Sequence, residues 1–301
     1  MADLAARLLA LAKPLSSFEM PLLDSHGATL AEDVYSGERV VLRSGSRIRA
    51  TQIGLAAAIG RNRLPTRPQP RVVVVSAGDD LVEPGGVLAD GGDEFEANSW
   101  LLTSAVKEAG AVGYRVTTIP ESAELLSGVL EDQLVRSDLL VICGESHDES
   151  FDLITEVLAG IGQIERVLPS IEGSGRHAFG SIGPDQTPVV VLPGDPIPAY
   201  ISTELFIRPM IRSMMGLIDL HRPISRATLT NEVTSVAGKH AFIRASLHVE
   251  KRNRRLVTAL ADQDDLVTLS DATGLIVMNE ETVRLRAGEE VDVLVLERRF
   301  T

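Results

Sequence analysis

The run VVVVS at Val72–Ser76 constrains the fold more than any other stretch of this chain. A continuous apolar run of this length is typical of a strand covered on both faces of a sheet. From Arg71 onward, such runs alternate with segments of helical periodicity, which predicts an α/β domain: a three-layer, mostly parallel sheet with helices on both faces. The predicted strands are Val72–Ser76, Tyr114–Ile119, Asp138–Cys143, Ile164–Leu168 and Val189–Leu192. The predicted helices run from Asn98 or Ser99, as capping residue, to Ala109, and over Ser122–Val135, Phe151–Leu158 and Ile197–Met215.

The two ends of the chain have different patterns. Before Arg71 we predict helices over Asp3–Lys13 and Ala50–Ile59, and then a boundary near Pro70, because three prolines within six residues interrupt regular structure. After Pro223, short β-type runs without a helix-length amphipathic stretch predict a small β-barrel or a sandwich, and we expect the barrel. The expected domains are therefore a helical N-terminal region (1–70), the α/β domain (71–221) and a C-terminal β domain (222–301).

Charge and composition narrow the possible partners. The 301 residues carry a formal net charge of -13 and 4% aromatic residues, so they repel phosphate backbones and provide few stacking surfaces for bases. We therefore expect no nucleic-acid partner. A single cysteine cannot form an internal disulfide or a multi-cysteine zinc site, which favours a reducing, cytoplasmic location. No apolar run approaches about 18 residues, so we expect no transmembrane segment and no leader.

Three loops follow predicted strands at the edge where open α/β sheets bind ligands. They are SAGDDL (76–81), CGESHDESFD (143–152) and LPGDP (192–196), and we expect them to converge on one site. In the first loop, Asp79 and Asp80 either contact a ligand or only form a turn.

The LPGDP loop combines rigid and flexible residues. Pro193 and Pro196 stiffen it, and Gly194 relieves its steric limits. Asp195 either contacts a ligand or caps the helix that follows.

The CGESHDESFD loop is acidic and contains no Lys or Arg. Its carboxylates repel a phosphate ligand, although a hard cation held by Glu145, Asp148 or Asp152 with His147 would reverse that effect. Acidic loops are usually only solvated, so we predict no metal site. Cys143 is expected to be a buried small apolar residue rather than a nucleophile.

The segment SIEGSGRHAFG (170–180) is predicted to be a surface loop. Arg176 and His177 are the only evident anion-binding groups near the proposed sheet edge.

Taken together, these motifs resemble the molybdopterin molybdenumtransferase family, that is MoeA and the E domain of gephyrin. The resemblance rests on VVVVSAGDDL with EANS after it, CGESHDESFD, RHAFG and VVLPGDPIPAYISTELFIRPMI. It extends to LLDSHGATLAEDVYS near the start and to GKHAFIRASL and SDATGLIVMNEETVRLRAGEEVDVLVL near the end, and so covers nearly the whole chain. It implies an α/β domain like that of the MoaB and Mog proteins.

The resemblance also implies a function and a set of residues. Such proteins insert molybdate into adenylylated molybdopterin, with Mg²⁺ as a possible cofactor, and usually form homodimers. Asp152 matches an acidic residue of the family's active site, and we predict that it is catalytic. The residues predicted to bind substrate are Asp79, Asp80, Asn98, Gly144, Ser146, Arg176, Pro193, Gly194, Asp195 and Pro196.

Departures from the family pattern matter for activity. The family's Ser-Gly-Gly-Val-Ser-Val-Gly loop is replaced by residues 143–149, and its Lys-Pro-Gly-Lys-Pro stretch is replaced by residues 172–176, with Arg176 in partial compensation. The family's insert domain is missing, because Glu32-Asp33-Val34 leads almost directly to VVLRSGSRIRATQIG. We therefore expect impaired molybdate insertion. A non-catalytic, gephyrin-like dimeric scaffold for a protein partner is the alternative, and a metal-dependent hydrolase is the third possibility.

Overall fold

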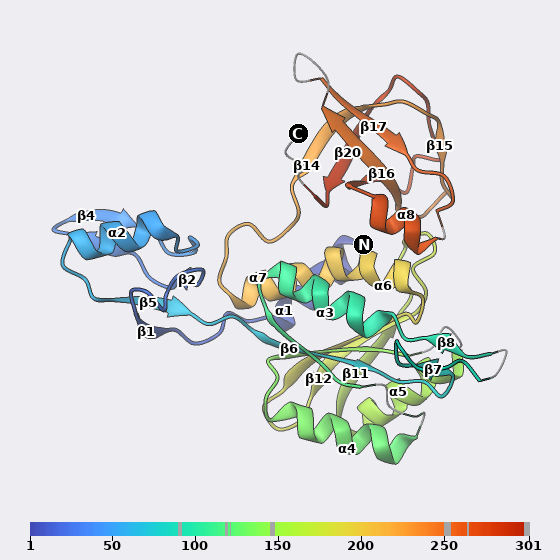
Figure 1. The fold of residues 1–301 in the computed structure, drawn as a ribbon, viewed down its shortest axis with the longest axis horizontal. Helices are drawn as coiled ribbons and strands as arrows, with labels where there is room; N and C mark the ends of the chain where they lie inside the picture. The colour runs from blue at the N-terminus through green and yellow to red at the C-terminus, as the bar shows by residue number, and fades with distance from the viewer. Residues whose placement is uncertain are drawn as a thin grey trace.

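The computed structural model describes residues 1–89, 92–117, 120, 122–144, 148–249, 254–263 and 265–297, without the side chain of Asp148. Figure 1 shows three parts: an arm at one side, a central α/β domain, and a barrel packed beside the helices of that domain. The predicted α/β fold and C-terminal barrel are confirmed.

The central sheet has the strand order β11-β12-β13-β10-β6-β9. Strands β13, β10, β6 and β9 run parallel to one another, whereas β12 is antiparallel to both of its neighbours. The bounds are Arg71–Ser76 for β6, Val112–Arg115 for β9, Leu139–Cys143 for β10, Gly162–Val167 for β11, His177–Ile182 for β12 and Thr187–Leu192 for β13.

The valines of β6 explain the three layers. Val72 and Val74 face one core with α1 (Ala2–Leu11), α3 (Asn98–Ala109) and α7 (Arg208–Met214), whereas Val73 and Val75 face α4 (Ala123–Leu134) and α5 (Asp148–Ile161). All four valines are fully buried. Alternate side chains of a strand point to opposite faces, so a run buried on both sides must be apolar throughout.

Two segments differ from the prediction. The expected surface loop at 170–180 includes β12, an interior strand, because Ala178 and Phe179 pack into the two cores while Gly180 fits against the backbone of Gln163. The helix expected over Ile197–Met215 is divided into α6 (Pro196–Ser202), a π-helical turn η1 (Thr203–Ile207) and α7. Pro209 has no N–H to donate within the helix, which favours such a local adjustment.

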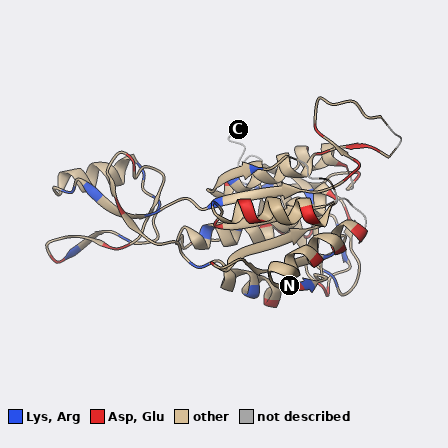
Figure 2. Cartoon of the chain, turned by 90° about the horizontal axis from the view of Figure 1, so that it is seen from below, with Lys and Arg blue, Asp and Glu red and all other residues tan. Residues whose placement is uncertain are grey.

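The arm comprises residues 18–67 and has its own core. It contains the predicted helix α2 (Ala50–Ala58) and also strands that the sequence analysis did not predict. These are β1 (Phe18–Pro21), β2 (Thr29–Leu30), β3 (Val34–Ser36), β4 (Arg39–Leu42) and β5 (Arg63–Arg67). Strands β1, β5 and β2 form one sheet, and β3 and β4 form a hairpin at the point where the family's insert is expected. Figure 2 shows the arm extending away from the rest of the chain.

The C-terminal part is a closed barrel in the order β14-β17-β16-β18-β20. Its strands are β14 (Ile224–Leu229), β16 (Ala241–Val249), β17 (Arg255–Ala259), β18 (Gly274–Met278) and β20 (Glu290–Val295). Outside the barrel lie β15 (Val233–Thr234), β19 (Arg284–Leu285) and the short helix α8 (Leu266–Asp271); β7 (Leu81–Val82) and β8 (Glu94–Phe95) pair in the α/β domain.

Candidate functional site

A cleft of about 700 Å³ lies between the α/β domain and the barrel. Residues 171–174 and the segment from Asp195 to Ser202 form one wall, and Ala241–Arg244 of β16 with residues near α8 form the other. We call this the interdomain cleft.

The three predicted loops leave adjacent strands at one sheet edge. Cys143 at the end of β10 is in register with Ser76 of β6 on one side and with Leu192 of β13 on the other. Of these loops, only LPGDP contributes described residues to the lining of the cleft, namely Asp195 and Pro196.

Packing and hydrogen bonds fix the LPGDP loop. Asn98, buried in the first turn of α3, donates from Nδ2 to the carbonyl oxygen of Gly194. Its other amide atom, Oδ1, is buried and accepts no hydrogen bond within the described chain. Gly175 lies against Pro193 with a φ of +66°, a conformation that favours glycine. Asp195 occupies the N-cap position of α6, although its side chain makes no capping hydrogen bond.

Arg244 is a cleft residue that sequence reasoning missed. It is 8% exposed and lies on β16 in the barrel wall. The Gln263 side chain fixes the backbone there, accepting from the Arg244 N–H at 2.8 Å and donating to the Arg244 carbonyl at 3.1 Å. The available signal was a charged residue inside the apolar strand pattern of AFIRASL.

The described lining of the cleft is more acidic than basic. Its charged side chains are Arg244 against Glu172, Asp195 and Asp265, a formal charge of one minus three, or -2. Two of the carboxylates are engaged with backbone: Glu172 accepts from Val236 N–H at 3.2 Å, and Asp265 caps α8 through Val267 N–H at 3.0 Å.

Asp152 lies outside this lining, on α5, where it is paired with two arginines. Its Oδ1 accepts from Arg166 at 3.2 Å and from Arg176 at 3.1 Å. Arg176 also covers the ring of Phe151, 4.5 Å from its centroid. The acidic segment therefore has basic partners in the fold. One of them, Arg166, comes from β11, and no local sequence pattern connected Arg166 with Asp152. The catalytic role of Asp152 and the binding role of Arg176 stay predictions.

The remaining predicted contacts are not among the described residues that line the cleft. Asp79 and Asp80 are exposed in the loop after β6. Gly144 is buried where a side chain would collide with Ser150 and Ile154 of α5, so this position requires glycine. Ser146, with Glu145 and His147, lies outside the described residues.

His177 is buried in β12, whereas the sequence analysis expected it in a surface loop. It is 3% exposed, its Nε2 lies 2.7 Å from Ser202 Oγ, and its Nδ1 lies 3.2 Å from the Gly175 carbonyl oxygen. Burial lowers the pKa of His177 to about 4, so the imidazole is neutral at pH 7.

The interpretation of Cys143 as a buried residue is confirmed. Its thiol donates to the Val75 carbonyl at 3.6 Å, and burial raises its pKa to about 12. A thiol in this state is a poor nucleophile.

The capping of α3 differs from the prediction. Neither Asn98 nor Ser99 caps the helix. Instead the buried carboxylate of Glu96 accepts from Ser99 N–H at 2.7 Å. A carboxylate near a helix N-terminus is favoured by unpaired N–H groups and by the helix dipole.

Within the described residues, no three His, Cys, Asp or Glu side chains gather as they would around a metal ion. The described helices include none long and apolar enough to cross a membrane.

Comparisons with known proteins match this architecture. Residues 73–213 match the family model described as "Probable molybdopterin binding domain", and residues 226–296 match the MoeA C-terminal region (domain IV). Molybdopterin molybdenumtransferase 1 of Mycobacterium tuberculosis is 33% identical over 271 residues, covering 88% of this chain and 63% of that protein. Molybdopterin molybdenumtransferase 2 of the same organism is 32% identical, covering 87% of this chain and 65% of that protein.

A solved structure supports the fold independently. The molybdopterin biosynthesis MoeA protein of Pyrococcus horikoshii superposes with a TM-score of 0.83 at 19% identity, covering 99% of this chain and 98% of that one. At this identity the likeness concerns the fold. This chain spans 63–65% of the length of the two curated relatives. The two domain matches, these relatives and the shared fold lead to one assignment. The chain belongs to the molybdopterin molybdenumtransferase (MoeA) family.

Proposed function

We propose that this chain binds adenylylated molybdopterin in the interdomain cleft and inserts molybdate with reduced efficiency. The observation that carries the proposal is the composition of the cleft: Arg244 is buried in one wall and the LPGDP loop forms part of the other, while the described lining has a formal charge of -2.

The chemistry of binding follows from these groups. The guanidinium of Arg244 is suited to hold a phosphate or molybdate oxygen through charge-assisted hydrogen bonds. The buried Oδ1 of Asn98 is an acceptor for a donor group near the LPGDP loop. These groups favour a polar, partly anionic ligand such as a pterin nucleotide.

The acidic side chains oppose the second substrate, molybdate, which is a dianion. Two unit charges about 4 Å apart interact with about 4 kcal/mol at an effective dielectric constant of 20, which is roughly a thousandfold in affinity. Glu172 stands where the family pattern has a lysine. The described residues contain no group of three His, Cys, Asp or Glu side chains that would hold Mg²⁺ without the phosphates of a substrate.

Calorimetric titration with adenylylated molybdopterin tests binding. We expect saturable binding, weakened more than about tenfold in Arg244→Ala because a charge-assisted contact is lost. Arg226→Ala is the matched control, since Arg226 lies on the barrel but is exposed and paired with Asp292. Equal affinity in both variants would show that the ligand binds elsewhere, and absence of heat with the wild type would refute the proposal.

Complementation of a strain that lacks the transferase tests the reduced activity. The wild-type chain should rescue weakly, whereas Glu172→Lys should rescue better because it restores a positive charge in the cleft. If Asp152 is catalytic, Asp152→Ala should lower the remaining molybdate insertion activity. Full rescue by the wild type would contradict the electrostatic argument.

A dimeric scaffold is the second candidate, favoured by the surface of the arm. Phe18, Leu23 and Tyr35 are 47%, 82% and 50% exposed there. Large exposed apolar patches often mark an interface, and we propose that these side chains take part in the homodimer contact. Light scattering that gives a monomer for the wild type would remove the homodimer, and a partner purified stoichiometrically with the chain would support the scaffold.

A further inference from the structure

A buried carboxylate organises the start of α3. Both oxygens of Glu96 are bound by the same residue: Oε1 accepts from Ser99 N–H at 2.7 Å, and Oε2 accepts from Ser99 Oγ at 2.6 Å. The Glu96 side chain is fully buried. A buried carboxylate needs both hydrogen bonds and a compensating charge, so the position of this helix end depends on a cation nearby.

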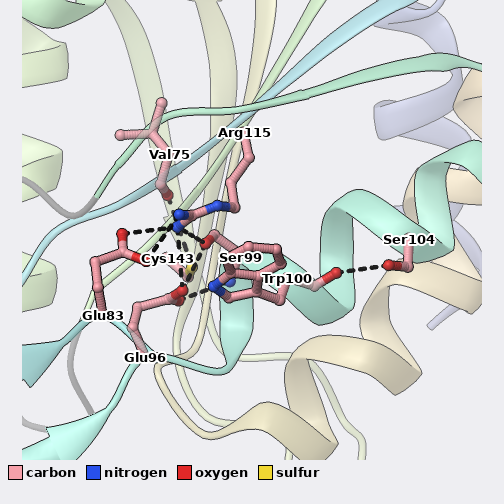
Figure 3. A network of polar contacts seen from close by, with 8 residues as sticks. All are labelled: Val75, Glu83, Glu96, Ser99, Trp100, Ser104, Arg115 and Cys143. Atoms are coloured by element: carbon pink, nitrogen blue, oxygen red, sulfur yellow. Dashed lines mark hydrogen bonds and ion pairs between the residues drawn. The ribbon is translucent and has the colours of Figure 1, made fainter. Parts of the chain in front are cut away.

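Arg115, at the end of β9, supplies that charge. Figure 3 shows its guanidinium surrounded by Glu83, Glu96, Ser99 and Trp100. It binds Glu83 with two hydrogen bonds of 2.8 Å, donates to Ser99 Oγ at 3.1 Å and lies 3.7 Å from Glu96 Oε2. It also lies 4.2 Å from the centroid of the Trp100 ring. A planar guanidinium makes these contacts simultaneously, which an ammonium group cannot do.

The first turn of α3 connects this network to the cleft. Asn98 lies between Glu96 and Ser99 in sequence and donates from Nδ2 to Gly194 in the LPGDP loop. The next residue, Asp195, lines the cleft, and its backbone carbonyl accepts from the Ala199 N–H at 3.1 Å in the first turn of α6. A shift of the α3 N-terminus therefore moves the Asn98 amide, which holds the LPGDP loop through Gly194.

We propose that Arg115 is a positioning residue for the LPGDP loop: it fixes Glu96 at the start of α3 and thereby sets Asn98 against Gly194 at the cleft. The effect of Arg115 on ligand binding rests on the proposed function, whereas its effect on the position of the LPGDP loop does not. Arg115 itself is not among the described residues that line the cleft.

Hydrogen exchange tests the connection without any ligand. In Arg115→Met, the four amides present in residues 193–199, those of Gly194, Asp195, Ile197 and Ala199, should exchange faster by on the order of tenfold, since coupling through packed elements is typically of this size. Arg71→Met is the matched control, because Arg71 forms a comparable two-bond pair with Asp138, at 2.9 and 3.1 Å, at the opposite edge of the sheet. It should leave exchange in 193–199 unchanged.

A milder pair of variants covers the case in which Arg115→Met does not fold. Ser99→Ala removes the hydroxyl that joins Arg115 to Glu96, whereas Ser104→Ala, on the same helix, removes only a bond of 2.8 Å to the Trp100 carbonyl. Faster exchange in 193–199 for Ser99→Ala alone supports the proposal. Unchanged exchange in Ser99→Ala, or equal changes in both serine variants, overturns it.

Ligand titration then separates the two claims. With adenylylated molybdopterin as the probe, Arg115→Met should raise the dissociation constant by on the order of tenfold while Arg71→Met leaves it at the wild-type value. The emission of Trp100, the single tryptophan, should also change in Arg115→Met, because the guanidinium leaves its ring. If exchange rises as expected but the wild type binds no ligand, the proposed function is wrong and the positioning of the loop is still supported.

Discussion

The arm and the α/β domain bury their apolar side chains in different ways. In the α/β domain, one sheet separates two cores, and the larger core continues into α1 and the barrel through Leu4, Phe242 and Leu275. The arm has one core of six buried residues, Leu30, Val34, Leu42, Ile48, Ala56 and Leu64. Because burial of apolar area is the main stabilising contribution, the α/β domain and barrel should unfold together, and the arm should be the less stable unit.

The barrel and the arm also differ in how strongly each is joined to the α/β domain. Arg222 binds Glu204 of η1 with hydrogen bonds of 2.7 and 2.8 Å and donates to the Leu296 carbonyl after β20 at 2.7 Å, so an ion pair with a buried carboxylate joins the barrel to the α/β domain. The arm is joined by extended chain, with Arg67 donating to the Leu15 carbonyl.

The largest expected effect comes from breaking the barrel junction. Arg222→Met removes the closer of two arginines at the carboxylate of Glu204, which is 1% exposed, and leaves only Arg208 at 3.9 Å; this should destabilise the chain by up to about 3 to 5 kcal/mol. Arg226→Met removes an exposed pair with Asp292 and should cost less than about 1 kcal/mol. Urea unfolding measures both, and equal losses would mean that the barrel junction is no stronger than a surface pair.

A matched pair of core substitutions compares the two regions directly. Leu140→Ala in β10 and Leu64→Ala in β5 each truncate a fully buried leucine and leave a cavity, which costs roughly 2 to 5 kcal/mol locally. Trp100 lies in the α/β domain and the arm has no tryptophan, so the fluorescence transition reports the α/β domain. Only Leu140→Ala should move that transition. A similar shift with Leu64→Ala would show that the arm and the domain unfold as one unit.

Acid should weaken the α/β domain through His177. Its pKa is about 4 in the folded chain, against 6.5 for the ordinary group, so the unfolded chain binds more protons between these values. The stabilising effect of keeping His177 neutral is complete above pH 6.5 and is lost as the pH falls toward 4, at most about 3 kcal/mol.

The difference between variants isolates this effect. His177→Gln should flatten the pH dependence of the Trp100 unfolding transition between pH 6.5 and 4, whereas His26→Gln, on an exposed arm residue, should leave it unchanged. Titration of the wild-type imidazole by NMR gives the pKa directly, and a value near 6.5 would contradict the prediction.

Local sequence was sufficient to predict an element where the apolar pattern of that element alone accounts for its burial. The valines of β6 and the apolar runs of β10 and β13 predicted the central sheet, and the loops after them predicted the edge that bears LPGDP. The same reasoning missed β12, because His177 and Gly180 interrupt its apolar character, although the neighbouring strands bury it.

The sequence by itself therefore determined the α/β class, the barrel and the family, since these follow from periodicity and from motifs contiguous in the chain. Only the tertiary structure decided which charges meet: Arg166 and Arg176 with Asp152, Arg115 with Glu96, and Arg244 with the cleft. Electrostatic interactions depend on distance in space, and strands far apart in the sequence supply the partners, so a count of charges in one loop could not predict the field in that loop.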